Sequence, residues 1–553
     1  MMDCDLTENL AIHLTRRAEQ QPYTAAVIFP EGRDRDGHVS YTHLTYQQLE
    51  QQSNRIACAL SQYGVRCGDR TVLMVKPSLN FFSLTFALFK LGAIPVLIDP
   101  GMGVENIKQC LEEVQPDVFI GIDKAHVARL LLGWGKNSLR LSITTGISLR
   151  STVPTLRTLV QRVAEAAPFT AHQPQNNETA AILFTSGSTG PPKGAIYTHT
   201  NFNAQIAALK QLYTIEPGEI DLCTFPLFAL FAPALGMTAV IPDMDATRPA
   251  QVNPQRIFEA IDNFGVTNMF GSPALLRRVA QQGLLQHKQL PTLNRVISAG
   301  APVPATVLEQ FTSMMVPEAK IYTPYGATES LPVCSIDSTT LLGETRYLSD
   351  QGKGTCVGQA IIDVQIIAID DEPIEHWTED LTVADGVIGE ICVRGPQVTS
   401  GYFNREQSNK RSKIFVEDGS FYHRMGDVGY RDDQGRIWFC GRKDHRVEHN
   451  GETLFSIPCE AVFNTHGDVF RTALVGLGSR PNQRAVLCVE LNPGIGKERH
   501  DSIRQQLRDI QNNYPHTQAI DTILFHPRFP VDIRHNAKIF REKLAVWAAK
   551  EVS

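Results

Sequence analysis

Short apolar runs rich in β-branched residues alternate with segments of helical periodicity through much of the first 360 residues. Six of these runs read TVLMVKP, IPVLIDP, DVFIGID, AAILFTSGS, TNMFGSP and RVISAG. Each ends in Gly, Pro, Ser or Asp, the residues that form turns. The alternation predicts strands and helices in βαβ order, and therefore parallel sheets covered by helices. Such sheets bind ligands at the carboxyl ends of their strands, where these turn residues lie.

From about residue 363 the pattern changes to β-rich segments separated by hairpin-like turns. These segments are residues 363–373, 389–395 and 429–442. A smaller unit follows and ends in an amphipathic helical pattern over residues 541–552. We therefore predict an α/β fold with a large N-terminal domain, residues 1–443, that combines βαβ sheets with a β-rich subdomain. A small α+β cap domain is expected over residues 444–553.

Two long apolar stretches, residues 81–98 and 225–242, raise the question of a membrane span. Charged, glycine and proline residues interrupt both: Lys90, Gly92 and Pro95 in the first, and Pro226, Pro233 and Gly236 in the second. A spanning helix needs about 20 predominantly apolar residues without such breaks. We expect the first stretch to form a helix that leads into a buried strand, and the second to form a buried helix beside an apolar pocket. The first residues show no pattern of a secretory signal.

Composition narrows the class of protein. The chain has 553 residues, of which 42% are hydrophobic and 20% charged, enough apolar surface for a folded core. Its net charge of −6 does not suit a nucleic-acid binder, which needs a basic excess. The 11 cysteines include no C-x-x-C pair, so metal clusters and disulfide scaffolds are poorly supported. Scattered thiols are typical of the reducing cytoplasm, which is the expected location.

Residues 181–194 read AILFTSGSTGPPKG, an apolar strand followed by a loop of Gly, Ser and Thr that ends in Lys193. Glycines let backbone N–H groups approach an anion, hydroxyls add donors, and lysine adds charge. The spacing differs from that of a Walker A loop. A polar turn of no function would be expected to be shorter, so this segment predicts a phosphate-binding loop.

The segment TSGSTGPPKG resembles the phosphate loop of the AMP-forming, acyl-adenylate superfamily, which includes acyl-CoA ligases, peptide-synthetase adenylation domains and luciferases. Further motifs resemble that superfamily in the same order: residues 44–50, 89–100, 325–329, 389–395, 401–402, 423–427, 441–444 and 536–539. The resemblance covers essentially the whole chain. It implies that ATP and a carboxylic acid react to an acyl adenylate and pyrophosphate, with Mg²⁺ as the cofactor.

The resemblance also implies roles for individual residues. The residues implied in catalysis are Thr185, Lys193, Glu329 and Lys538, with Glu329 holding the metal. Those implied in nucleotide binding are Ser186, Gly187, Ser188, Thr189, Gly190, Gly300, Ala301, Pro302, Tyr325, Gly326, Thr328, Asp427 and Arg442. Asp427 would accept from the ribose hydroxyls, and Tyr325 would present its ring to adenine. The small domain would rotate about a hinge at Asp444 after adenylation.

The acyl substrate is expected to bind among apolar residues. The residues expected to line this tunnel are Phe228, Ala229, Phe231, Phe270 and Gly271. No charged group is evident there for a substrate ammonium, although the phenylalanines could equally be core residues. Within the superfamily the chain is most similar to the branch that forms β-lactones in bacterial long-chain olefin biosynthesis, including the small or altered residues Ala229, Met425 and Ala537. This similarity implies a 2-alkyl-3-hydroxy fatty acid whose own hydroxyl displaces AMP.

Three other functions remain open. The chain could be a long-chain acyl-CoA ligase, a peptide-synthetase-like enzyme that loads a carrier protein, or a non-catalytic nucleotide-binding protein. Glu448 stands where the superfamily often has lysine and is expected to repel the phosphates of CoA. The intact phosphate loop, Glu329 and Lys538 argue against a non-catalytic protein. The resemblance further implies partner enzymes of the olefin pathway, a decarboxylase and a reductase.

Overall fold

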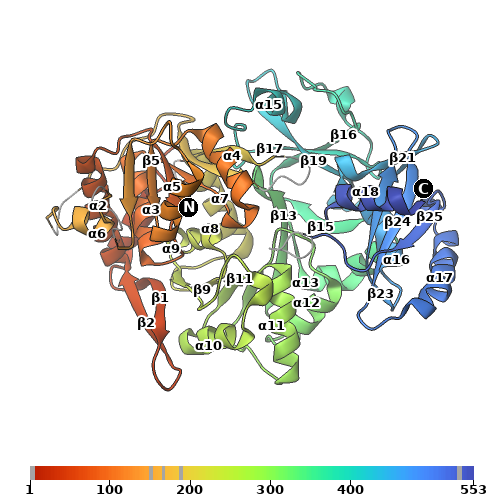
Figure 1. Cartoon of the computed structure of the whole chain (residues 1–553), viewed down its shortest axis with the longest axis horizontal. Coiled ribbons are helices and arrows are strands. Elements are labelled where there is room, and N and C mark those ends of the chain that lie inside the picture. The colour runs from red at the N-terminus through yellow and green to blue at the C-terminus, as the bar shows by residue number, and fades with distance from the viewer. Residues whose placement is uncertain (1–5, 148–152, 165–168, 186–190, 532–538, 553) are drawn as a thin grey trace.

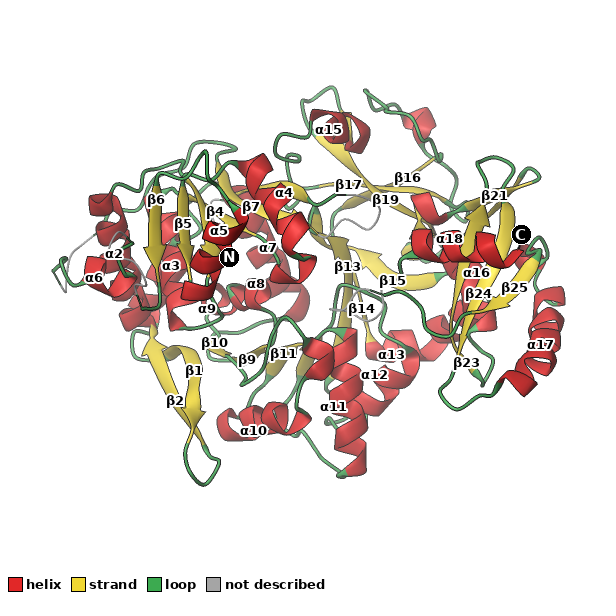
Figure 2. Ribbon diagram, in the orientation of Figure 1, coloured by secondary structure: helices red, strands yellow, loops and turns green. Residues whose placement is uncertain are grey.

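The computed structural model describes residues 6–147, 153–164, 169–185, 191–531 and 539–552. Along the long axis of the molecule, the N-terminal sheet lies at one end, a large sheet in the middle, and a small C-terminal sheet at the other end (Figure 1). Helices flank each of the sheets (Figure 2). The short helices outside the sheets include α1 (Ile12–Gln20), α6 (Leu156–Val160), α13 (Ser338–Thr340), α14 (Arg346–Asp350) and α15 (Glu406–Ser412).

The N-terminal sheet has the order β6-β5-β3-β4-β7-β8 within the described residues. Its strands are β3 (Arg70–Met74), β4 (Ile94–Leu97), β5 (Val118–Gly121), β6 (Leu141–Thr144), β7 (Thr179–Thr185) and β8 (Lys193–Thr198). All neighbours pair in parallel except β8, which runs antiparallel to β7. The connecting helices are α3 (Leu79–Leu91), α4 (Val104–Val114) and α5 (Asp123–Leu132), and α2 (Tyr46–Tyr63) packs on α3. The predicted βαβ arrangement is confirmed.

The large sheet consists of a parallel half and an antiparallel half that meet at β13 (Lys320–Ala327). Its parallel half contains β1 (Ala25–Arg33), β9 (Ile220–Cys223), β10 (Thr238–Val240), β11 (Asn268–Phe270) and β12 (Arg295–Ile297), with β2 (Val39–Thr45) antiparallel at its edge. The helices of this half are α7 (His199–Tyr213), α10 (Pro254–Phe264), α11 (Pro273–Leu285) and α12 (Ala305–Thr312). The carboxyl ends of β11, β12 and β13 therefore lie side by side.

The antiparallel half confirms the predicted β-rich segment. Its strands are β14 (Ser330–Asp337), β15 (Thr355–Ala360), β16 (Asp363–Ile367), β17 (Gly389–Arg394), β18 (Lys413–Phe415), β19 (Phe421–Arg431) and β20 (Arg436–Arg442). Valine and isoleucine side chains alternate between its faces, and those on one face form a core of their own with Met425.

The described C-terminal residues form a two-stranded sheet, β21-β22, and a separate three-stranded sheet, β23-β24-β25, with a core of their own. The elements are β21 (Val447–His449), β22 (Glu452–Leu454), β23 (Val469–Leu477), β24 (Arg484–Leu491), β25 (Thr522–Phe525), α16 (Ser456–Phe463), α17 (His500–Asn512) and α18 (Arg541–Val552). Phe463, Leu487 and Leu507 are fully buried in that core. Helix α16 packs against β20, where a Cβ on Gly441 would lie 2.3 Å from Ser456 Oγ. The division into domains at residue 444 stays a prediction.

Both interrupted apolar stretches are buried. Residues 81–98 form most of α3 and then β4, as predicted, and Gly92 ends the helix with a φ of 74°. Lys90 is buried in α3, with its Nζ 2.7 Å from Glu50 Oε2. Residues 225–242 form two short helices, α8 (Pro226–Ala229) and α9 (Phe231–Leu235), and then β10, rather than one helix. No helix in the described part of the chain is long and apolar enough to cross a membrane.

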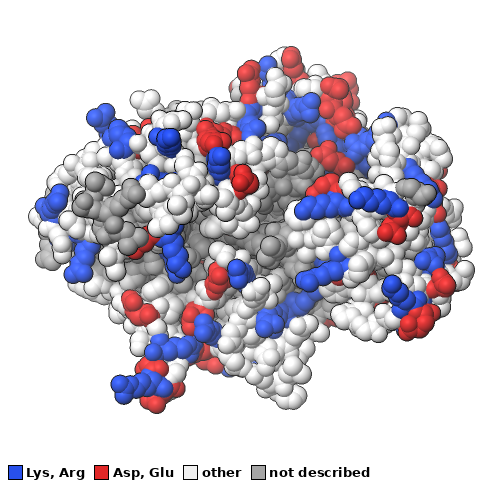
Figure 3. All heavy atoms as spheres, viewed as in Figure 1, with Lys and Arg blue, Asp and Glu red and all other residues white. Residues whose placement is uncertain are grey.

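The visible surface carries both signs of charge. Lysine and arginine side chains are interspersed with aspartate and glutamate over the face in Figure 3. This mixture agrees with the small net charge of −6.

Candidate active site

A cavity of about 1820 Å³ is lined by some of the predicted nucleotide residues and some of the predicted acyl residues. Lys193, Gly300, Gly326, Thr328, Glu329 and Arg442 line its polar part, and Phe228, Phe231 and Phe270 line its apolar part. The polar residues come from strand ends and turns of two sheets: Lys193 starts β8 of the N-terminal sheet, and the others lie in or after strands of the large sheet. Ala301, Pro302, Tyr325, Asp427 and Gly271 are not among the residues that line it.

Glu329 lies in the turn between β13 and β14 and faces the cavity. Tyr402 donates its hydroxyl hydrogen to Glu329 Oε1 at 2.6 Å. The Nζ of Lys193 lies 5.0 Å from the centre of the Tyr402 ring. Among the described residues, the other carboxylate oxygen has no hydrogen-bond donor, so it is available to a cation. One carboxylate beside phosphate oxygens is a common magnesium environment, and Glu329 therefore fits Mg²⁺.

Two residues near Glu329 were missed by the sequence-based prediction. Tyr402 belongs to a recognised motif, but no role was inferred for it. Lys413, on β18, is buried and donates to the Thr399 carbonyl at 2.5 Å. Burial lowers the pKa of Lys413 to about 7, and Glu329 opposes that shift. Lys413 lies outside every motif, so only the structure associates it with the site.

The predicted phosphate loop joins two paired strands. The backbone of Thr185 at the end of β7 pairs with that of Lys193 at the start of β8. Tyr197, further along β8, donates to the Thr328 carbonyl at 2.5 Å and so ties this hairpin to the turn that carries Glu329. Ser186, Gly187, Ser188, Thr189 and Gly190 lie outside the described residues, as does the side chain of Thr185.

Asp427 is buried on β19 and has two partners from the predicted nucleotide motifs. Tyr325 donates to Asp427 Oδ2 at 2.7 Å, and Arg442 Nη1 lies 2.9 Å from Oδ1. Burial raises the pKa of Asp427, while the charge of Arg442 opposes that shift. The Tyr325 ring lies tilted against Phe439, with 5.9 Å between ring centres. The structure thus places Tyr325 against two residues that are paired across β19 and β20 and lie more than 100 positions further along the chain.

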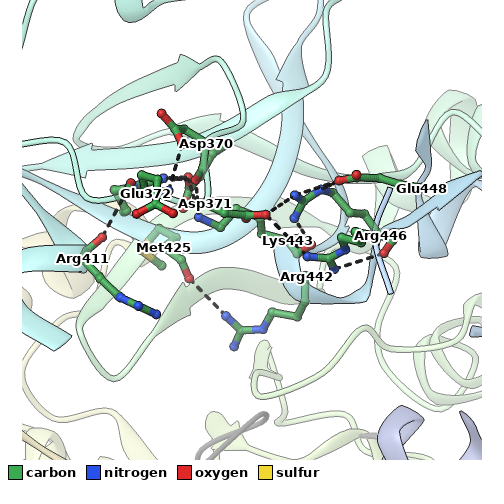
Figure 4. A network of polar contacts seen from close by, with 12 residues as sticks. Asp370, Asp371, Glu372, Arg411, Met425, Arg442, Lys443, Arg446 and Glu448 are labelled. Carbon is green, nitrogen blue, oxygen red and sulfur yellow. Dashed lines mark hydrogen bonds and ion pairs between the residues drawn. The ribbon is translucent and has the colours of Figure 1, made fainter. Parts of the chain in front are cut away.

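A network of polar contacts surrounds the predicted hinge (Figure 4). Lys443 Nζ donates to the Asp370 carbonyl at 2.8 Å, and Arg446 Nη2 lies 2.6 Å from Asp371 Oδ2. Arg442 points the other way and donates to the Met425 carbonyl (Figure 4). The Asp444 carbonyl accepts from Arg480 at 2.7 Å. Residues on both sides of the predicted hinge are therefore connected by charged groups.

Two carboxylates near the predicted hinge, Glu390 and Glu448, form ion pairs that the sequence did not indicate. The buried Glu390 binds both Arg424, at 2.6 Å, and Lys443, at 3.1 Å, so three separate motifs converge there. Glu448 lies 2.9 Å from Arg446 Nη2. The repulsion of CoA by Glu448 stays a prediction. The ion pair with Arg446 offsets the negative charge of Glu448 that this repulsion needs.

Lys538 lies outside the described residues, but both ends of its segment are placed. Val531 and Ile539 form an antiparallel bridge, and the Phe540 N–H donates to the Pro530 carbonyl at 2.9 Å. Arg541 Nη2 then lies 2.6 Å from Glu460 Oε1 in α16. The two ends of the segment that carries Lys538 are therefore held together and anchored to the C-terminal core.

Three of the predicted acyl-binding residues form an aromatic cluster. The ring centre of Phe228 lies 4.6 Å from that of Phe270 and 6.5 Å from that of Phe231. Ala229 is only 4% exposed and packs in the core, because consecutive residues of a helix point in different directions. The cluster gives the cavity an apolar surface.

Behind this cluster lies a small, mostly apolar cavity that contacts the buried Asp221. Asn268 and Cys223 donate to the Asp221 carboxylate at 2.5 and 3.2 Å, yet burial raises its pKa to about 6. The folded protein therefore holds this proton to a higher pH than the unfolded chain. The protonated Asp221 therefore contributes its full stability below the unfolded pKa of 3.8. That contribution is lost as the pH rises through 6.

Replacing Asp221 with asparagine should therefore stabilise the protein above pH 6. We expect a gain in unfolding free energy of up to about 3 kcal/mol at pH 8, falling to about half of that at pH 5. Chemical unfolding of both proteins at the two pH values measures the difference. An equal effect at pH 5 and pH 8 would contradict the raised pKa.

Comparisons with known proteins agree with this geometry. The model of the AMP-binding enzyme family matches residues 14–403. The chain is 47% identical to an olefin beta-lactone synthetase of Xanthomonas campestris pv. campestris and 49% identical to one of Stenotrophomonas maltophilia, with 98% of each chain covered in both cases. The solved structure of the amide bond synthetase McbA from Marinactinospora thermotolerans has the same fold, with a TM-score of 0.79, 20% identity, and 97% of this chain and 99% of that chain covered. The chain belongs to the AMP-binding enzyme family.

Proposed function

We propose that the protein uses ATP to adenylate a long-chain 2-alkyl-3-hydroxy fatty acid and then closes the product to a β-lactone. The observation that carries this proposal is the single cavity that joins Glu329, Thr328 and Lys193 to the aromatic cluster of Phe228, Phe231 and Phe270. A carboxylate placed between these two regions would have its alkyl chain on apolar surface and its charge beside phosphate-binding groups. The high identity to olefin beta-lactone synthetases supports the same substrate class.

The reaction has two steps, and in each step one bond forms while another breaks. A carboxylate oxygen attacks the α-phosphorus of ATP, and the bond to the β-phosphate breaks with release of pyrophosphate. The 3-hydroxyl oxygen then attacks the acyl carbon, the bond to AMP breaks, and the hydroxyl proton is lost. The second step is intramolecular, so it needs no thiol and gains from the proximity of the hydroxyl.

The chain supplies positive charge and hydrogen-bond donors to the triphosphate and the reacting carboxylate, where negative charge accumulates. We assign Lys193 and the segment from Thr185 to Gly190 to the triphosphate, and Lys538 to the reacting carboxylate and α-phosphate. Mg²⁺, which Glu329 would hold, neutralises part of the triphosphate charge when bound. Asp427 and Arg442 are assigned to the ribose side of the nucleotide. The C-terminal unit, residues 444–553, would move Lys538 away after adenylation by rotation at Asp444.

Product analysis without a thiol tests this function. Protein, ATP, Mg²⁺ and a 2-alkyl-3-hydroxy acid should yield AMP, pyrophosphate and β-lactone in equal amounts. The matched 2-alkyl acid without the 3-hydroxyl should support ATP–pyrophosphate exchange but yield no lactone. Acyl product that appears only with CoA, or only with a carrier protein, would instead establish one of the two alternative functions.

The chemistry of substrate and product indicates the neighbouring reactions. A 3-hydroxy acid arises by reduction of a 3-keto acid, so a reductase would supply the substrate. Loss of CO₂ from a β-lactone leaves an olefin, so a decarboxylase would consume the product. We propose both as partner enzymes and the cytoplasm as their shared compartment.

A further inference from the structure

A thiol, an imidazole and a carboxylate converge on the N-terminal sheet, outside the cavity of the active site. Cys67 lies in the loop between α2 and β3, while His172 and Glu178 precede β7. The Cys67 Sγ lies 3.7 Å from His172 Nε2 and 4.0 Å from Glu178 Oε1. His172 Nε2 and Glu178 Oε1 are 2.7 Å apart. None of the three residues lines the active-site cavity.

Backbone contacts hold these groups in place. The His172 N–H donates to the Lys90 carbonyl at 2.7 Å, and the His172 carbonyl accepts from Asn9 Nδ2 at 2.9 Å. Glu178 Oε2 accepts from the Gln175 N–H at 2.9 Å, which aims the other carboxylate oxygen at the imidazole. The site therefore joins two segments separated by about a hundred residues of chain.

The close approach of the three groups depends on Gly92. A Cβ at this position would lie 2.7 Å from His172 Cδ2 and 2.9 Å from Cys67 Sγ. Gly92 also has a φ of 74°, which favours glycine. Both the space and the backbone conformation at Gly92 thus allow the imidazole and the thiol to lie together.

The donor set points to one class of ligand. Sulfur, imidazole nitrogen and carboxylate oxygen are the ligands of Zn²⁺, and tetrahedral bonds of about 2.0 to 2.3 Å place such donors about 3.3 to 3.6 Å apart. The two distances from Cys67 Sγ, 3.7 and 4.0 Å, are within about half an ångström of this range. The distance between His172 and Glu178 would lengthen when the metal replaces their shared hydrogen.

The alternative of a reactive thiol is not favoured. A nucleophilic cysteine needs a lowered pKa and positive surroundings. Burial, and then the charges of Glu178 and Asp69, raise the pKa of the Cys67 thiol instead. Negative neighbours disfavour a free thiolate but attract a cation.

We propose that Cys67, His172 and Glu178 bind a Zn²⁺ ion through Sγ, Nε2 and Oε1, with water as the fourth ligand. Binding releases the thiol proton as the S–Zn bond forms, and the imidazole proton moves to Nδ1. The ion would fasten the segment before β7 to the loop after α2. This inference does not depend on the proposed function, because the site lies apart from the catalytic cavity.

Titration of the whole, chelator-treated protein with Co²⁺ and Zn²⁺ tests the site. Co²⁺ should bind one to one with a thiolate-to-cobalt absorption band, Zn²⁺ should displace it, and the melting temperature should rise with Zn²⁺. Cys67→Ser and His172→Gln should lower the affinity at least about 10-fold and remove the band. His38→Ala is the matched control, since His38 lies in an exposed Asp34–Asp36–His38 group without a thiol.

Circular dichroism of the metal-free variants separates lost binding from lost folding. A charge-transfer band that survives in Cys67→Ser would overturn the proposal, as would loss of binding in His38→Ala alone. Absence of stoichiometric binding in the parent protein would also overturn it. Lactone formation by the zinc-free protein, assayed with ATP and Mg²⁺, is expected to stay within about twofold, so failure of this site and failure of the proposed function give different results.

Discussion

Replacing Glu329 with glutamine should lower the rate of adenylate formation by about 100- to 1,000-fold. Glutamine preserves an oxygen for the hydrogen bond from Tyr402, which is 2.6 Å from the native carboxylate. The substitution therefore removes the negative charge and little else. Because that charge is assigned to holding Mg²⁺ beside the triphosphate, the variant should also need more Mg²⁺ for half-maximal rate.

ATP–pyrophosphate exchange as a function of Mg²⁺ concentration measures both effects. Glu318→Gln is the matched control, because Glu318 is exposed and does not line the cavity, and its rate should equal that of the parent. A Glu329→Gln variant with an unchanged magnesium dependence would show that this carboxylate does not hold the metal.

Changing Lys538 to alanine should abolish adenylation, with a loss of about 1,000-fold or more. Two anions, the carboxylate and the α-phosphate, approach each other in this step, and a lysine between them would stabilise the charge that develops. Pyrophosphate release with the 3-hydroxy acid measures the step directly. Lactone formation from a synthetic acyl adenylate should be much less affected, because no phosphate is then attacked.

Lys550→Ala is the control for this substitution, since Lys550 is exposed in the last turn of α18. Equal melting temperatures of the two variants would show that the fold is intact. Unimpaired pyrophosphate release by Lys538→Ala would contradict the assigned role.

Much of the fold could be predicted because local patterns of apolar and turn residues determine where the strands and helices form. Apolar runs that end in turn residues indicated the parallel strands, and the change of pattern near residue 363 indicated the antiparallel segment. Prediction was weaker over residues 225–242, where two short helices and a strand replace the expected single helix. A periodic apolar pattern does not separate a short buried helix from a buried strand.

The candidate site was predictable only in part. The motifs indicated Glu329, Lys193 and Asp427. A sequence motif does not, however, show which residues contact these side chains in space. Tyr402 reaches Glu329 from a segment 73 positions away. Lys413 is buried close enough to Glu329 for that charge to affect its pKa, although nothing in its local sequence distinguishes it from a surface lysine.

The sequence by itself determined the fold class and the family, because both depend on residue types at short spacing. The phosphate-binding role of the loop stays a prediction. Only the tertiary structure decided which charges are paired and which are available. Arg442 neutralises Asp427, Arg446 balances Glu448, and Glu390 binds both Arg424 and Lys443. The convergence of Cys67, His172 and Glu178 was likewise decided by the tertiary structure. The strength of an ionic or metal contact depends on distance and burial, which arise only when distant segments pack together.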